Sequence, residues 1–520
     1  MKKSIFVAFV VSLGGFLFGF DAGIISGVMS YAGPEFNLTD GQLGWAVSSP
    51  SFASMFAMLI SGRLSDVIGR KKILIIVAFL YAVSAILSAY AISYEMLYIS
   101  RMIGGLAFGA ALILAPTYIA EISSAKNRGK LVSIQQLNIV LGFFVAFLSN
   151  YFFNKAFTSG ESTFLTEENV WRWMLGVEFI PAVVYFILMF FVPRSPRWLF
   201  AKKKNVEAVG VLVNMHGEVL AQEEAKLITA SLEQNSSSND KVKFKDLFKP
   251  AFRLVLIIGL VIGVLQQITG INAIYFYATS IFKQTGIGTD AAFASGILLS
   301  LTTVVFTVIA ILLIDKMGRR PLMLIGIGGV AISLLICAYG FNNATYQITS
   351  EKIVKLEFAY KYRLEPYADQ LFTNDLDFKN KMKTVLGNHV YVKNEGAILE
   401  AATHMNSVLV LLGVLCFIAC FAFSLGPVMW VMLSELFPNR YRGLAIGVIG
   451  FVNSFASWLV QQVFPWELSN FGNAMSFFIF GAIALVGFFI LLKILPETKG
   501  KTLEQIEKDL VKFKDIKSNL

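Results

Sequence analysis

Charged residues are scarce in this sequence, at 15% of 520 residues, whereas hydrophobic residues make up 56%. Cysteine and histidine occur only three times each, and the cysteines all fall in apolar runs. So few cysteines argue against a disulfide framework, and three scattered histidines argue against a haem or metal-centred enzyme. No loop of the Gly-x-x-x-x-Gly-Lys-Ser/Thr type is present, which argues against an ATP-driven pump. The composition is not that of a water-soluble protein.

Long apolar runs are what the sequence does have. They recur at about the 20 residues that a helix needs to cross a bilayer. The first run follows Lys2 and Lys3 like a signal peptide, but it contains Asp21 and no clear small-residue cleavage site, so we interpret it as a retained helix. We predict twelve spanning helices, at residues 5–30, 44–62, 73–93, 96–120, 131–153, 172–192, 252–281, 290–314, 322–341, 405–432, 442–465 and 472–495.

The positive charges are distributed unevenly among the loops. The net charge of +10 comes mostly from Lys and Arg in short loops that follow even-numbered spans, whereas residues 31–43 carry none. Positively charged short loops stay in the cytoplasm, so we expect both termini inside and a multi-pass protein of the cell (inner) membrane. The same placement favours the lipid bilayer, and not nucleic acid, as the partner of this charge.

The chain divides into two similar halves. Two charged motifs occur once in each half: Asp66-Val-Ile-Gly-Arg-Lys and Asp315-Lys-Met-Gly-Arg-Arg, then Glu121…Arg128-Gly and Glu435…Arg442-Gly. The two motifs lie further apart in the second half than in the first, which means that the second half contains an insertion. We assign this insertion to the polar residues 342–404 on the extracytoplasmic face. Duplicated six-helix halves around a midplane site are typical of secondary carriers. We therefore predict a first bundle over 1–193, a cytoplasmic linker with short helices over 194–251, a second bundle over 252–497 and a cytoplasmic tail over 498–520.

Three amides lie deep in one apolar run, where unpaired polar groups are costly. Gln266, Gln267 and Asn272 occur within seven residues of the run 254–281, with Gly270 between them. We predict that the helix unwinds at Gly270, because an interrupted helix that presents amides at mid-membrane is how secondary carriers build a binding site. The alternative is that the amides only bond neighbouring helices.

Together these motifs resemble the sugar porter family of the major facilitator superfamily, and its bacterial proton-coupled monosaccharide symporters in particular. The resemblance covers nearly all of the chain except 342–404, and it rests also on Arg101-Met-Ile-Gly-Gly, Pro193…Ser195-Pro196-Arg197-Trp198, Gly426-Pro427-Val428-Met429-Trp430, Ser434-Glu435-Leu436-Phe437-Pro438 and Pro496-Glu497-Thr498-Lys499-Gly500. It implies an all-α membrane protein with the major facilitator fold, twelve transmembrane helices in two six-helix bundles. It also implies a monomer that transports a monosaccharide, has no cofactor besides the proton as coupling ion, and is not an enzyme.

The resemblance further implies a set of sugar ligands. The matching positions are Gln136, Gln266, Gln267, Asn272, Trp430 and Asn453. Amides donate and accept hydrogen bonds with vicinal hydroxyls, and an indole suits the apolar face of a sugar ring. For Trp430 alone, anchoring at the membrane interface is the alternative. Phe143 lies where xylose-type symporters tend to have Gln, which favours a hexose over a pentose.

Asp21 is an isolated carboxylate deep in the first predicted span, where it must be paired or protonated. Arg101, at the start of the fourth span, is the candidate partner, and proton-coupled members of the family share this Asp and Arg. Moving Asp21 between a site beside Arg101 and a neutral buried site would load and release a proton. Two alternatives stay open: a facilitative uniporter in which Asp21 forms a static ion pair, and a non-transporting sugar sensor, which the short tail disfavours.

Eight charged residues match the family's cytoplasmic gate: Asp66, Arg70, Glu121, Arg128, Asp315, Arg319, Glu435 and Arg442. We expect them to pair across the two halves and to close the inner face, with modest energies because such pairs must break and reform. The alternative is a set of solvated loop charges, but the symmetry of the set favours the gate. Arg194 replaces the Glu of the family's Pro-Glu-Ser-Pro-Arg motif, so we expect a rearranged salt bridge on this face.

Overall fold

The computed structural model describes residues 2–124, 127–160, 162–237, 247–437 and 439–499. Its first half contains α1 (Lys2–Glu35), α2 (Asp40–Ile68), α3 (Arg70–Ala89), α4 (Tyr94–Ile122), α5 (Arg128–Thr158), α6 (Val170–Gly176) and α7 (Phe179–Phe191). Three short helices follow in the linker, α8 (Pro196–Ala201), α9 (Asn205–His216) and α10 (Glu218–Ser237). The second half contains α11 (Pro250–Ile268), α12 (Ile271–Phe276), α13 (Ala278–Lys283), α14 (Thr289–Met317), α15 (Arg319–Asn342), α19 (Ser407–Phe423), α20 (Leu425–Leu436) and α21 (Asn439–Ile494).

The described helices supply the twelve predicted spans. Eleven helical stretches are long and apolar enough to cross a membrane, and the last of them, Tyr441–Ile494, leaves helical geometry at Gly472 and so contributes two. The predicted loop between these two spans is wrong, because the helix continues as far as Gly472. Asp375 explains the sharp restart: its carboxylate accepts hydrogen bonds from the backbone N and the side-chain Nδ2 of Asn473, at 3.1 and 3.0 Å.

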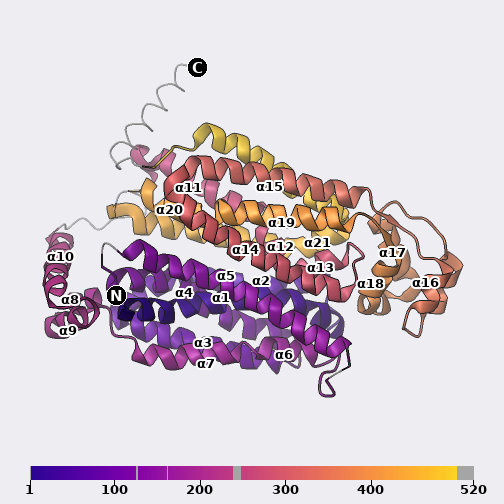
Figure 1. The fold of residues 1–520 in the computed structure, drawn as a ribbon, viewed down its shortest axis with the longest axis horizontal. Helices are drawn as coiled ribbons and strands as arrows, with labels where there is room; N and C mark the ends of the chain where they lie inside the picture. Colours follow the sequence, from indigo (N-terminus) through magenta and orange to yellow (C-terminus); the bar gives the residue numbers. More distant parts are fainter. Residues whose placement is uncertain (1, 125–126, 161, 238–246, 438, 500–520) are drawn as a thin grey trace.

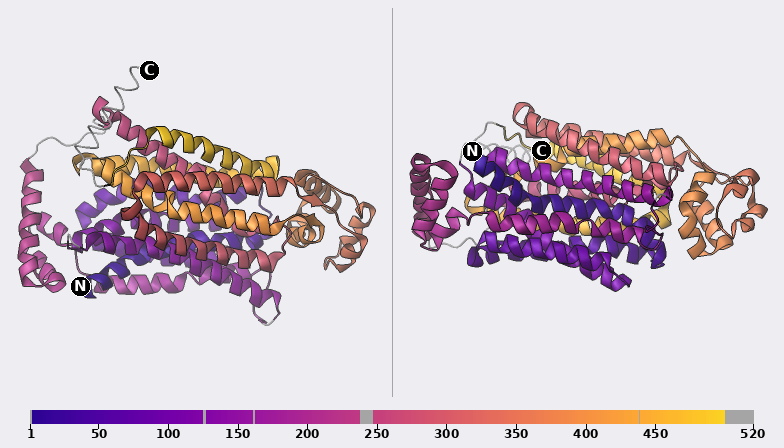
Figure 2. Two further views of the ribbon diagram at one scale, coloured as in Figure 1. Left: turned by 45° about the horizontal axis from the view of Figure 1, so that its top comes forward. Right: turned by 60° about the horizontal axis from the view of Figure 1, so that its bottom comes forward.

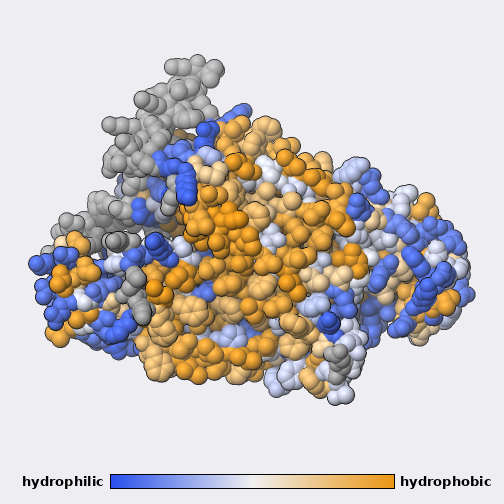
Figure 3. Space-filling view, in the orientation of Figure 1, coloured by the Kyte–Doolittle hydropathy of each residue, from blue (hydrophilic) through white to orange (hydrophobic). Residues whose placement is uncertain are grey.

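The two halves lie side by side along the length of the molecule. In Figure 1 the indigo-to-magenta helices of the first half form one layer and the pink-to-yellow helices of the second half form the other. Helices α8 to α10 lie at one end, which we call the linker end, and α16 to α18 lie at the opposite insertion end, as Figure 2 confirms from other sides. Figure 3 shows a hydrophobic belt between two hydrophilic ends, as a bilayer-embedded bundle requires.

Close helix crossings hold the first bundle together. A Cβ atom on Gly19 of α1 would lie 2.0 Å from the carbonyl oxygen of Ile139, and one on Gly142 of α5 would lie 2.0 Å from that of Phe16. Only glycine allows two backbones to approach so closely, which is how small residues drive helix association in membranes. The crossing brings α5 against α1 two residues from Asp21.

The insertion forms a small folded unit of its own. It contains β1 (Thr345–Tyr346), α16 (Ser350–Lys355), the 3₁₀ helix η2 (Lys361–Tyr367), α17 (Asp375–Leu386), α18 (Asn388–Ala402) and β2 (Thr403–His404). The two strands pair antiparallel, Thr345 with His404. Its own hydrophobic cluster includes the buried side chains of Tyr346, Phe378 and Tyr391. This unit therefore has a core separate from the two bundles.

Candidate functional site

The amide-rich stretch lies at a true break in the helix. Helix α11 ends at Ile268, Gly270 adopts a left-handed conformation with φ of 86°, and α12 begins at Ile271. The predicted unwinding at Gly270 is confirmed. A side chain there would also collide with Phe480, whose ring lies 2.6 Å from the position of a Cβ atom. Glycine therefore satisfies both the backbone conformation and the packing at this point.

Four of the six predicted sugar ligands meet at this break. Gln267 Nε2 donates to Asn453 Oδ1 at 3.2 Å, and Asn453 Nδ2 donates to Gln266 Oε1 at 2.8 Å. Asn272 Nδ2 donates to Gln267 Oε1 at 2.8 Å. The break rotates the short helix α12 so that Asn272 returns to the amides that precede it. The result is a continuous network of donors and acceptors among neutral side chains, which is the chemistry that matches hydroxyl groups.

The network extends along α21 to residues that sequence reasoning missed. Asn272 Nδ2 also donates to Ser457 Oγ at 2.6 Å, and Gln461 Nε2 donates to the same oxygen at 2.8 Å. Asn453, Ser457 and Gln461 are spaced four residues apart, so they lie on one face of the helix. That spacing of polar residues in an apolar run was a signal in the sequence that could have identified them.

A second helix break supports the same network. Gln266 Nε2 donates to the carbonyl oxygen of Leu425 at 2.9 Å, at the start of α20. Ser424, between α19 and α20, has φ of −130° and ψ of −90°, so the tenth span is interrupted just before Pro427. Trp430 follows on α20 with 41% of its surface exposed. Trp430 is thus the most exposed of the six predicted sugar ligands.

Gln136 lies apart from the other five candidates. Its side chain on α5 is half-buried, and no hydrogen bond joins it to another of the described residues. Its neighbour Gln135 is buried against Gly15, and both of its amide atoms are without a partner within the described part of the chain. Phe143, two turns further along α5, packs on Tyr275 with ring centroids 4.8 Å apart and so closes α5 against α12.

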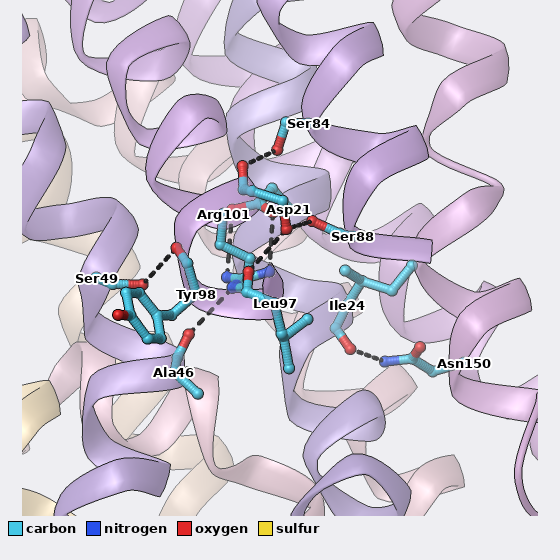
Figure 4. Close-up of polar contacts among 11 residues, drawn as sticks. Asp21, Ile24, Ala46, Ser49, Ser84, Ser88, Leu97, Tyr98, Arg101 and Asn150 are labelled. Carbon is cyan, nitrogen blue, oxygen red and sulfur yellow. Dashed lines mark hydrogen bonds and ion pairs between the residues drawn. The ribbon is translucent and has the colours of Figure 1, made fainter. Parts of the chain in front are cut away.

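Asp21 and Arg101 form the buried ion pair that the sequence predicted. Arg101 Nη1 donates to Asp21 Oδ1 at 3.0 Å, and Nη2 approaches Oδ2 at 3.4 Å, as Figure 4 shows. Arg101 Nε also donates to the carbonyl oxygen of Ala46 at 3.1 Å. Both residues are buried, with Asp21 5% exposed and Arg101 2% exposed. The pair thus joins α1, α2 and α4 inside the first bundle.

A third buried charge lies near this pair and was missed. Glu178 sits between α6 and α7, is only 4% exposed, and interacts electrostatically with Asp21 and with Arg101. The backbone keeps right-handed helical angles between α6 and α7, so the predicted sixth span is one apolar stretch over Val170–Phe191. A lone carboxylate within the apolar run 172–192 is the same signal that identified Asp21, so the sequence did contain it.

The charged motifs at the linker end pair inside each half. Arg70 Nη2 lies 2.8 Å from Asp66 Oδ1 and 3.1 Å from Glu121 Oε1, all in the first half. Arg319 Nη2 lies 2.8 Å from Glu435 Oε1 in the second half. These described ion pairs each lie within one half, and pairing across the halves stays a prediction.

The remaining gate positions contribute less. Arg442 Nε donates to the carbonyl oxygen of Phe437 at 3.3 Å, within its own half. The side chains of Arg128 and Asp315 lie outside the described part of the structure. Arg194 pairs with Glu207 of α9 at 3.3 Å, a rearrangement of the kind that its substitution predicted.

Glu497 fixes the end of the second bundle to the start of α15, a contact that the sequence did not reveal. Its carboxylate accepts hydrogen bonds from the backbone N of Arg319 and of Arg320, both at 3.1 Å. Burial acts to raise the pKa of Glu497, but the backbone N–H groups of Lys499, Arg319 and Arg320 outweigh it and lower the pKa overall. An anion at a helix N-terminus is also favoured by the helix dipole.

The halves touch one another away from the linker end. Among the described residues, every hydrogen bond or ion pair that joins them lies in the middle of the bundle or toward the insertion end, for example Ser26–Thr279 (3.0 Å), Asn154–Asp290 (2.6 Å) and Ser51–Gln461 (3.0 Å). Within the described part of the chain, the polar contacts between the halves are therefore concentrated away from the linker end.

Known proteins share both the sequence and this architecture. A family model described as "Sugar (and other) transporter" matches residues 7–362 and 382–510. The arabinose-proton symporter of Bacillus subtilis is 34% identical over 98% of this chain and 95% of its own length. The galactose-proton symporter of Escherichia coli is 32% identical over 98% of this chain and 95% of its own length. The inward open conformation of the xylose transporter of Escherichia coli superposes with a TM-score of 0.74 at 29% identity, over 97% of this chain and 99% of that one.

Proposed function

Because the chain belongs to the sugar transporter family of the major facilitator superfamily, we propose that it imports a monosaccharide together with a proton by alternating access. As a member of that family it is a multi-pass membrane transporter and not an enzyme. The observation that carries the proposal is the pairing of a neutral amide network at the Gly270 break with a buried ion pair between Asp21 and Arg101. We expect the carrier to act as a monomer.

The sugar is held mainly by the second half. Gln266, Gln267, Asn272 and Asn453 exchange hydrogen bonds with one another here, and sugar hydroxyls would replace part of that network with equivalent bonds. Trp430 is partly exposed and supplies an apolar face for the ring. Gln136 would add a ligand from α5 of the first half. The hydrophobic Phe143 on the same helix favours a hexose over a pentose.

The proton is handled by the first half. In the present conformation Arg101 stabilises the charged form of Asp21 through two contacts. A rearrangement that separated the pair would leave a buried carboxylate, and such a group binds a proton because burial disfavours its charged form. Glu178 interacts electrostatically with both members of the pair, so its protonation state would depend on theirs. Alternation between the two arrangements would couple proton movement to the movement of the halves.

The linker end is proposed to face the cytoplasm, on the basis of its Lys- and Arg-rich loops. The structure, whose described polar contacts between the halves lie away from that end, would then represent the inward-facing state. In the opposite state the eight gate residues would meet across the halves, and the contacts at the insertion end would break. In this scheme, the gate charges form the ion pairs within each half only in the inward-facing state.

The proposal is tested in proteoliposomes with labelled glucose, galactose, arabinose and xylose, with and without an inward proton gradient. The native protein should accumulate at least one sugar above equilibrium only when the gradient is present. Asp21→Asn should abolish this accumulation and still exchange labelled for unlabelled sugar. Equal, non-concentrative uptake by both proteins would identify a uniporter with a structural ion pair. Absence of flux for every sugar would reject monosaccharide transport.

A further inference from the structure

A large cavity at the insertion end lies outside the amide network. It has a volume of about 840 Å³, is partly open to solvent, and is lined mainly by the ends of α1 and α5, the segment from α12 to α13 and the insertion helices α17 and α18. We call it the outer chamber. Cavities of about 300–1,000 Å³ are the size in which proteins bind small molecules. The contacts that close the insertion end separate it from the Gly270 break.

The insertion is fixed to the second half and reaches over the chamber to the first. Asp375 of α17 binds Asn473 at the turn of α21, and Glu395 of α18 accepts a hydrogen bond from Gln284 Nε2 at 3.2 Å. Within the described residues, its one ion pair to the first half joins Lys393 Nζ to Glu167 Oε2 at 2.9 Å. The insertion therefore forms a roof that meets the first half through this exposed ion pair and through packing of α18 against α1.

The walls of the chamber carry opposite charges. The basic residues all come from the second half and its insertion: Lys283, Lys379, Lys383, His389 and Lys393. The acidic residues of the first half face them: Glu35, Asp40, Glu167 and Glu168. Glu395 is the one acid on the basic side, and it is engaged by Gln284 and by Tyr391, whose hydroxyl lies 3.4 Å from Oε1.

Two of the lysines have ammonium groups that form no hydrogen bond or ion pair with another described residue. Lys283 Nζ lies 5.8 Å from the ring centroid of Phe293, and burial lowers the pKa of Lys283 to about 8 although Glu395 opposes the shift. Lys383 Nζ lies 5.9 Å from the ring centroid of Tyr391. An ammonium group has three donors, and a desolvated one is stabilised by any ligand that offers oxygen acceptors.

The charge pattern selects the class of ligand. An anion would meet four carboxylates on one wall, and a cation would meet four lysines on the other. A neutral polyol avoids both penalties, since each hydroxyl donates to a carboxylate and accepts from an ammonium. The half-buried ring of Tyr31 in the lining adds an apolar face of the kind that packs on sugar rings.

We propose that the outer chamber is a second carbohydrate site, roofed by the insertion, that holds a neutral sugar before it reaches the amide network. The inference rests on the proposed function for the identity of the ligand. The family model leaves out residues 363–381, so part of the roof departs from the general pattern of the family. The chamber site would thus be a property of this chain and of relatives with a similar insertion.

The test is ligand-observed saturation-transfer NMR on the full-length purified protein, with glucose, galactose and xylose as probes. Gln266→Ala combined with Asn272→Ala weakens the amide network, and binding to the chamber should remain as a residual signal. Adding Lys283→Met and Lys383→Met should remove that signal. Lys381→Met is the matched control, because Lys381 lies on α17 over the ring of Tyr367 and does not line the chamber. Monodisperse elution and an unchanged melting temperature establish that each variant is folded.

The outcomes separate this inference from the proposed function. A residual signal that disappears only with the two chamber lysines supports the second site. No residual signal in the Gln266→Ala/Asn272→Ala protein, together with sugar transport by the native protein, rejects the chamber site alone. A residual signal that survives the loss of both lysines also rejects it. A stronger signal from glucuronate than from glucose rejects the neutral ligand class. No binding and no transport by the native protein rejects both proposals.

Discussion

The two bundles follow one plan but bury different polar groups. The first holds a charged pair, Asp21 and Arg101, whereas the second holds a network of neutral amides around Gln267. A buried charge responds to a proton, and amides respond to hydroxyls. On the proposed function, ion and sugar are therefore handled mainly by different halves. Their coupling must then depend on how the halves move against each other, since no direct contact joins the two groups among the described residues.

The largest effect is expected from breaking the charged pair of the first half. Arg101→Met leaves Asp21 buried without its partner, which should lower the free energy of unfolding by about 3–5 kcal/mol. Thermal unfolding of the purified protein in detergent measures this loss. Asp21→Asn combined with Arg101→Met is the control, and it should recover most of the stability because no uncompensated charge remains. If Arg101→Met is as stable as the native protein, the first half does not depend on a buried charged pair, and this difference between the halves does not hold.

The next effect concerns sugar affinity in the second half. Asn272→Ala removes a donor that bridges Gln267 and Ser457, so the sugar concentration for half-maximal uptake should rise about tenfold, equivalent to about 1.4 kcal/mol. Asn150→Ala is the matched control, since Asn150 is a buried amide of the first half that donates to the carbonyl oxygen of Ile24 at 2.9 Å. Uptake kinetics for both variants decide the point. An equal rise in the half-maximal sugar concentration for Asn150→Ala would mean that both halves contribute to sugar affinity.

A third prediction compares the buried carboxylates of the two halves. Glu178→Gln removes the acid that interacts with Asp21, so it should change the pH dependence of gradient-driven uptake and leave sugar exchange intact. Glu467→Gln is the control in the second half, because Glu467 is also buried, at 8% exposed, but lies on α21. Uptake measured across external pH compares them. If only Glu467→Gln changes the pH profile of uptake, the proposal that the first half handles the proton is wrong.

The smallest effect concerns the gate motifs that the halves share. Asp66→Asn and Glu435→Gln each remove one ion pair confined to a single half, and each should cost about 1 kcal/mol or less. The two losses should add to within about 0.5 kcal/mol, because sites that share no partner behave independently. Melting temperatures of the single and double variants provide the measurement. Strong non-additivity would indicate that the charges pair across the halves in solution.

Local features of the fold were predictable because their causes are local. The break at Gly270 follows from a glycine in a polar stretch of an apolar run, and the spans follow from hydropathy. The break at Ser424 precedes a Gly-Pro pair and was readable in the same way, although we predicted a continuous tenth span. The continuation of α21 to Gly472 was not readable, because it depends on Asp375 in a distant insertion.

Within the candidate site, the sequence indicated which side chains are polar at mid-membrane but not how they connect. Gln267 and Asn453 are 186 residues apart, and their hydrogen bond depends on the packing of α11 against α21. The same limit applies to Glu178, whose proximity to Asp21 depends on the fold of α6 and α7 around α1. Gln136 matches a ligand position of the family, yet its side chain forms no hydrogen bond with the amide network among the described residues. A sequence match therefore did not predict this contact.

The sequence by itself determined the number of spans, their duplication, the Gly270 break and the identity of the buried charges. Each of these depends on the composition of one short segment, through hydropathy, backbone preference or the cost of burying a charge. Only the tertiary structure decided the partners of Gln266, the confinement of the gate pairs to each half and the outer chamber under the insertion. Those features depend on contacts between distant segments, and on which of two arrangements of the same halves the chain adopts.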